Sequence, residues 1–138
     1  MAHQTFMEAQ EQRNSTLQML LQFKAEKAQS ALSDAEIDFG ATDPADSHEA
    51  VEKAQKAVEQ AMVKHYFAQR LFLKFEAELA KGISDQVEFE LAEAVAAGDK
   101  NAWQTAQAAY YEARNRSNTA EKVFLDFEAM GLQLVAAG

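Results

Sequence analysis

Histidine and carboxylate side chains are the residues of this sequence whose chemistry would suit a metal site or catalysis. His3, His48 and His65 lack the His-x-x-x-His spacing that places two imidazoles on one helical face for zinc. Ala45 and Met62 stand three residues before His48 and His65, where two-metal helical bundles carry glutamate. The sequence has no cysteine, which excludes disulfides, thiolate catalysis and cysteine-bound zinc. We therefore predict no metal and no cofactor.

The acidic residues form no recognisable catalytic motif. The alternating acids of residues 34–38 resemble the start of a calcium-binding loop, but the glycine at the sixth position and the glutamate at the twelfth are missing. Pairs such as Glu76 with Glu78 and Glu88 with Glu90 fit the solvated face of an acidic helix better than a general acid–base pair. Glycine-rich phosphate loops and nucleophile elbows are also missing. The sequence predicts a protein that is not an enzyme.

Length and composition favour one helical domain. The chain has 138 residues, of which 48% are apolar, with one proline and five glycines. This apolar share suffices for a core of its own, and the abundant Ala, Glu, Gln, Lys and Leu all favour helix. We predict an all-α protein with a single domain over residues 1–138.

Charge and hydropathy limit the partners and the compartment. The net charge of −9 disfavours direct binding to nucleic acid phosphates, and two acidic segments, residues 33–59 and 76–99, each carry a net charge of −6. The amino terminus has no basic patch followed by an apolar core, and no apolar run approaches the length of about 18 residues that indicates a membrane span. We expect a cytoplasmic protein that binds neither nucleic acid nor membrane directly.

An internal repeat organises the sequence. Residues 72–77 recur with one change at 124–129 and more loosely at 20–25, so that each copy starts 52 residues after the last. A fixed period of this length is typical of stacked helical units. The copies are a partial one over residues 1–19, full ones over 20–71 and 72–123, and a partial one over 124–138.

Three long helices are predicted from apolar residues at spacings of three and four. The first covers residues 5–32, the second residues 46–82 and the third residues 99–134. The predicted buried stripe of the first helix is Phe6, Ala9, Thr16, Leu20 and Phe23, widened by Leu17, Leu21 and Ala28. The predicted heptad seams of the other two are Val51, Ala54, Val58, Ala61, His65, Ala68, Phe72, Phe75 and Leu79, and Trp103, Ala106, Tyr110, Ala113, Ser117, Ala120, Phe124, Phe127, Gly131 and Leu134.

The first junction is predicted from capping residues. Ser33 with Glu36 has the form of a capping box, so a short helix is expected there, ending at Gly40. A loop is expected over residues 40–47, and Asp46 is predicted to cap the second long helix.

The second junction is predicted in the same way. Gly82 is expected to end the second long helix, because glycine readily takes the left-handed conformation at a helix C-terminus. Ser84 is expected to start a second short helix that Gly98 closes, and Asp99 to cap the third long helix.

Helix length decides the expected arrangement. Parallel neighbours would require a connection of about 16 residues to return about 50 Å, which a helical connection cannot span. We therefore predict three antiparallel long helices with coiled-coil-like heptad packing and the two short helices folded over the ends. A superhelical stack of bent hairpins is the alternative. Arg13, His65 and Ser117 occupy one register of the three copies and are predicted to form a polar layer that sets this register.

Four aromatic residues, Tyr66, Phe67, Phe89 and Tyr111, fall outside the seams and form the candidate interaction surface. A helix with apolar surface beyond one seam often buries the excess in another chain. The sequence therefore predicts a homo-oligomer and a function in protein–protein interaction or assembly, as an adaptor or chaperone-like accessory factor of the kind found in phages and secretion systems. The alternatives are an acidic nucleic-acid mimic that inhibits a DNA-binding or nuclease protein, and a cryptic metal-binding bundle.

Overall fold

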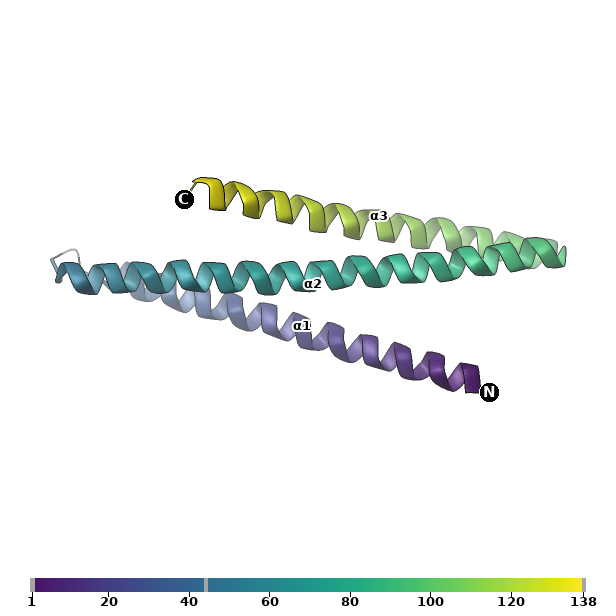
Figure 1. Ribbon diagram of the computed structural model, residues 1–138, viewed down its shortest axis with the longest axis horizontal. Coiled ribbons are helices and arrows are strands. Elements are labelled where there is room, and N and C mark those ends of the chain that lie inside the picture. Colours follow the sequence, from purple (N-terminus) through teal and green to yellow (C-terminus); the bar gives the residue numbers. More distant parts are fainter. Residues whose placement is uncertain (1, 44, 138) are drawn as a thin grey trace. The chain divides into compact units, whose positions relative to one another are not determined.

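The structure, a computed structural model, consists of three long helices (Figure 1). It describes the backbone of residues 2–43 and 45–137, and the side chains of residues 5–43 and 45–132. Within these ranges no residue lies in a strand, so the prediction of an all-α protein with three long helices is confirmed. The helices are α1 (Ala2–Ala41), α2 (His48–Ala97) and α3 (Lys100–Ala137).

The chain divides into two compact units, Met1–Phe72 and Leu73–Gly138. Helix α2 continues through this boundary, so unit 1 contains α1 with the first part of α2, and unit 2 contains the rest of α2 with α3. The boundary falls next to residue 72, where one predicted repeat copy gives way to the next. The single antiparallel bundle, its heptad packing and the 52-residue repeat stay predictions.

The two short connecting helices predicted from the sequence are wrong. Ser33 lies inside α1, and Gly82 and Ser84 lie inside α2, which has 50 residues. A serine caps a helix only where the preceding chain leaves the helical conformation, and here the chain on both sides of Ser33 and Ser84 is helical. A glycine in a helix interior costs only about 1 kcal/mol relative to alanine, so it does not by itself end a helix.

Replacing Gly82 with alanine is expected to stabilise the protein. Because Gly82 is helical and a Cβ there would meet nothing within 4 Å, the substitution should raise the free energy of unfolding by about 0.5–1 kcal/mol. Gly98→Ala is the contrasting variant, since Gly98 has a φ of 69° and alanine there should cost about 1 kcal/mol or more. Urea denaturation followed by circular dichroism measures both changes. A destabilised Gly82→Ala protein would contradict the continuous helix.

The turn between α1 and α2 is closed by side-chain hydrogen bonds. The Asp43 carboxylate accepts from the backbone N–H of Ala45 at 2.9 Å, and the Asp46 carboxylate accepts from the N–H of Asp43 at 3.2 Å. Ser47 Oγ accepts from the N–H of Ala50 at 3.2 Å, so Ser47 is the N-cap of α2. The prediction that Asp46 caps this helix is therefore wrong by one residue, because the Asp46 carboxylate is used inside the turn.

The turn between α2 and α3 forms as predicted. Gly98 takes the left-handed conformation, with a φ of 69°, and its N–H donates to the carbonyl of Val95 at 3.2 Å. Asp99 Oδ1 accepts from the N–H of Ala102 at 3.1 Å, and the carbonyl of Asp99 accepts from the N–H of Trp103 at 2.9 Å. These bonds satisfy N–H groups that have no partner inside α3, which confirms Asp99 as its N-cap.

The less exposed positions of α2 and α3 are spaced by three and four residues. Every predicted seam position of α2 is half-buried, and those of α3 from Ala106 to Gly131 are half-buried or buried. Trp103 is 36% exposed, and the side chain of Leu134 lies outside the described residues. In unit 2, α2 has a further run of less exposed positions at Leu73, Ala77, Ala80, Ser84, Val87, Leu91 and Ala94.

The main part of the predicted buried stripe of α1 is wrong, because Phe6, Ala9, Thr16, Leu20 and Phe23 are all exposed. The positions predicted to widen it, Leu17, Leu21 and Ala28, are half-buried. Two grooves in unit 1 explain which face of α1 turns inward, since both are lined by alanines of α1 and α2. Small side chains allow two helix backbones to approach closely, so the alanine-rich face is selected. The positions that are less exposed instead are Asn14, Gln18, Leu21, Ala25, Ala28, Leu32 and Ala35. The alanines that line the grooves are Ala28, Ala31, Ala35, Ala50, Ala54, Ala57 and Ala61.

Three alanines and Gly131 are the buried residues of the described chain. Ala25 is 5% exposed, and Ala94 and Ala113 are each 8% exposed. Among the residues whose side chains are described, no large side chain is fully buried. A large hydrophobic side chain contributes about 1.5–3 kcal/mol when fully buried, so the stabilisation available within this chain alone is limited.

Candidate protein-interaction surfaces

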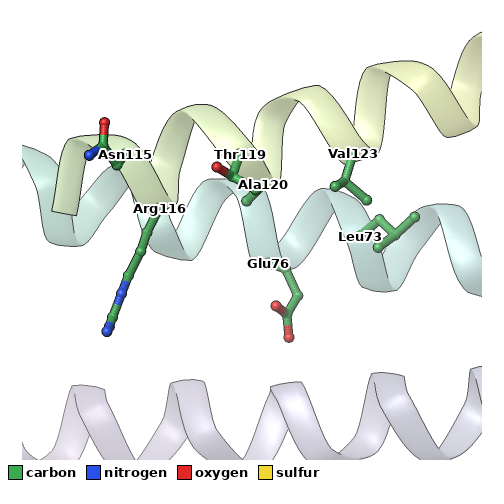
Figure 2. A pocket seen from close by; sticks show the side chains of 7 residues that line it. All are labelled: Leu73, Glu76, Asn115, Arg116, Thr119, Ala120 and Val123. Carbon is green, nitrogen blue, oxygen red and sulfur yellow. The ribbon is translucent and has the colours of Figure 1, made fainter. Parts of the chain in front are cut away.

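A shallow groove of about 380 Å³ lies between α2 and α3 within unit 2 (Figure 2). Leu73, Ala120 and Val123 supply its apolar surface, and Glu76 and Arg116 extend their charged ends to the same side. Arg116 pairs with Glu112 of the same helix at 2.7 Å, with both side chains mostly exposed. The complete lining is Leu73, Glu76, Asn115, Arg116, Thr119, Ala120 and Val123.

This groove has the composition of a contact surface. Arg116, Thr119 and Val123 are exposed, so the groove does not exclude water as a catalytic site usually does. An exposed ion pair such as Arg116 with Glu112 contributes at most about 1 kcal/mol. Apolar side chains ringed by charged ones are typical of protein–protein contact surfaces.

The first acidic segment, residues 33–59, forms the end of unit 1 at the turn between α1 and α2. Its eight acids are all exposed, and Lys53 and Lys56 lie among them. A groove of about 420 Å³ on α2 is lined by Glu49, Glu52, Lys53 and Lys56, and Lys56 pairs with Glu52 at 3.7 Å. The carboxylates on this part of α2 are therefore interrupted by cations.

Two of the four predicted interface aromatics lie in each compact unit. Phe67 is 59% exposed in unit 1, and its ring lies edge-on to the half-buried Tyr66, with 5.4 Å between the ring centroids. Phe89 and Tyr111 are 59% and 58% exposed in unit 2. The structure brings Tyr66 and Phe67 together, and three of the four rings are largely open to solvent. The ring centroids of Tyr111 and Tyr110 are also 5.8 Å apart. The Tyr110 hydroxyl accepts a hydrogen bond from the Arg114 guanidinium at 2.6 Å.

The predicted polar layer is mixed in its exposure. His65 and Ser117 are half-buried on α2 and α3, whereas Arg13 is exposed on α1. The guanidinium of Arg13 therefore lies in water in unit 1, and the role of these three residues as a layer stays a prediction. An exposed arginine in an otherwise apolar stripe is available for a contact with another chain.

Sequence reasoning missed the exposed apolar stripe of α1 as a candidate site. Met19 is 71% exposed, Phe6 64%, Phe23 62% and Leu20 46%. The sequence contained a signal that distinguishes this exposed face of α1 from the face that packs against α2. The run from Asn14 to Ala35 steps by four and three without a gap, and it carries the alanines that the turn brings against α2.

The described residues form neither a metal site nor a membrane-spanning helix. No three His, Asp or Glu side chains among them converge in a way that would hold a metal ion, and the position of His3 is not included in the described side chains. Over the same residues, no helix combines the length and the apolar character needed to cross a membrane.

Comparisons of this chain with protein-family models, with curated proteins and with solved structures found no match.

Proposed function

We propose that this chain is a non-enzymatic helical protein that acts by binding other protein chains, as an assembly or adaptor component. The observation that carries the proposal is the exposure of large apolar side chains on all three helices, while the buried residues among those described are three alanines and Gly131. Residues of this kind usually meet another protein surface, because exposed apolar area is stabilised by removal from water.

The exposed aromatic residues supply candidate contact points for a partner. Aromatic residues often account for much of the binding energy at interfaces, because each ring buries a large area with few rotatable bonds. Phe67 and Phe89 are the two rings of the candidate surface that have no polar atom, and each is 59% exposed. We assign them as the most sensitive positions for partner binding.

An acidic nucleic-acid mimic is the second candidate function, favoured by the eight exposed acids in residues 33–59. A mimic needs carboxylates in a row that imitates phosphate spacing. Lys53 and Lys56 interrupt the row, and Lys56 pairs with Glu52 at 3.7 Å, which weakens this candidate. Competition with DNA for a basic protein, lost as salt is raised, would support the mimic over the assembly component.

Partner capture tests the assembly function. The full chain, immobilised and incubated with extract of its own source, is expected to retain a defined protein partner. Phe67→Glu should reduce that retention at least about tenfold, since loss of one well-buried aromatic contact costs about 2 kcal/mol or more. Quantitative mass spectrometry measures the retained partner.

The matched control is Gln55→Glu, an exposed position of the same helix that gains the same charge. It should leave the retention unchanged. Equal loss of partner retention in Phe67→Glu and Gln55→Glu would show a charge effect. Full retention of the partner by both Phe67→Glu and Phe89→Glu would show that these aromatic residues do not lie in the interface.

A further inference from the structure

The exposed stripe of α1 follows the same heptad frame as the covered seams of the other two helices. We define the α1 outer stripe as Phe6, Ala9, Arg13, Thr16, Leu20 and Phe23, whose steps are three, four, three, four and three residues. All six are exposed. The positions 52 and 104 residues later are all half-buried or buried: Val58, Ala61, His65, Ala68, Phe72 and Phe75 in α2, and Tyr110, Ala113, Ser117, Ala120, Phe124 and Phe127 in α3.

A seam of this kind is expected to pack against another helix. A different face of α1, about 120° around the helix, is already used, since its less exposed positions from Asn14 to Ala35 include Ala28 and Ala35, which line the grooves shared with α2. The α1 outer stripe is therefore a second heptad face of one helix, which is the arrangement of a helix with two helical neighbours.

We infer that the α1 outer stripe is a self-association face, and that its occupant is the same stripe of a second copy in antiparallel orientation. The order of side chains along the stripe is self-complementary in this orientation. Phe6 of one copy meets Phe23 of the other, and Ala9 meets Leu20, which places a small residue opposite a large one. A two-fold axis then lies between Arg13 and Thr16.

Charge favours the same orientation. In a parallel pair Arg13 would face Arg13 of the second copy, and two like charges at a seam repel. In the antiparallel pair the two arginines move out of one layer, to about 4.5 Å apart along the axis, and each lies across from Thr16. The Thr16 hydroxyl donates to the carbonyl of Gln12 at 2.9 Å and so keeps its oxygen as an acceptor. Residues 5–32 carry three acids and three bases, so two copies approach along this part of α1 without a net charge penalty.

The area is sufficient for a specific but modest interface. From Phe6 to Phe23 the stripe is about 26 Å long. Each exposed phenylalanine ring removes roughly 100 Å² or more from water on contact, so two stripes bury on the order of 1,000 Å², the lower bound for a specific interface. Association is therefore expected to depend on protein concentration in the micromolar range, and it leaves Phe67 and Phe89 free for a different partner.

Sedimentation equilibrium of the full chain tests this inference. The wild-type chain is expected to form dimers, and Leu20→Glu with Phe23→Glu should raise the dimer dissociation constant at least about a hundredfold, because each change occurs twice in a symmetric pair. Gln10→Glu with Gln29→Glu is the matched control, since both positions are exposed on α1 outside the stripe and the added charge is equal. The control should dimerise like the wild type.

Disulfide trapping tests the orientation, and it stands even if the glutamate variant fails to fold. The sequence has no cysteine, so single-cysteine chains carry no background. Mixed Ala9→Cys and Leu20→Cys chains, distinguished by a mass tag, should cross-link to each other faster than to themselves. Faster self-linking of either chain would overturn the antiparallel pairing.

The outcomes separate this inference from the proposed function, which it deepens by naming a partner. A wild-type chain that stays monomeric but binds a partner through Phe67 would overturn the self-association face and leave the assembly function standing. The self-association face would also be overturned if the Leu20 and Phe23 changes left the dimer unaffected. The same holds if another part of the same chain covers the stripe.

Discussion

Replacing Ala113 with glutamate is expected to lower the free energy of unfolding by at least about 3 kcal/mol, because the site is only 8% exposed. Forcing a larger side chain into such a position costs about 1–3 kcal/mol, and the desolvated carboxylate adds a further penalty. Urea denaturation followed by helical circular dichroism measures the loss.

Ala109→Glu is the matched control, one turn earlier on α3 at an exposed position. It should change the free energy of unfolding by no more than about 0.5 kcal/mol. Equal stability of the two variants would mean that Ala113 does not lie at a close helix contact. The comparison therefore tests the assignment of alanine as the residue that sets the helix spacing in unit 2.

The thermal midpoint of unfolding is expected to rise with protein concentration. Association stabilises the folded chain by mass action, so a hundredfold rise in concentration adds about 2.7 kcal/mol per dimer and raises the midpoint by about 5 °C. Differential scanning calorimetry over two decades of concentration measures this shift. A midpoint that stays constant while unfolding is reversible would indicate that the folded chain is a monomer.

The sequence allowed the turn between α2 and α3 to be predicted. Gly98 next to Asp99 combines a residue that readily takes a positive φ with one that caps a helix, and both signals act at the same place. Such agreement between neighbouring residues is what makes a local prediction reliable.

The missed junctions had only one weak signal each. Ser33 and Gly82 are each compatible with a helix end, but they are also tolerated inside a helix at a cost of about 1 kcal/mol or less. Long flanking stretches of good helix formers outweigh that cost. A single serine or glycine in an alanine- and glutamate-rich chain is therefore insufficient evidence for a break.

The inward face of α1 was mispredicted for a different reason. The helix carries two heptad faces, one with Phe6, Leu20 and Phe23 and the other with Leu21, Ala25 and Ala28. Side-chain size favours the first, but the choice depends on the helix that α1 meets, which is a property of tertiary packing. The positions of α2 and α3 that match Phe6, Leu20 and Phe23 in the heptad frame are half-buried. We therefore infer that the exposed face of α1 is a surface for another chain.

The molar mass of the wild-type chain in solution is the most direct test of this account, in which helices that bury no large side chain within the described residues complete their core by association. Sedimentation equilibrium from about 1 to 500 µM is expected to give at least twice the chain mass of 15.3 kDa at the upper end, with dissociation on dilution. A mass of 15.3 kDa at every concentration, together with cooperative unfolding, would contradict it.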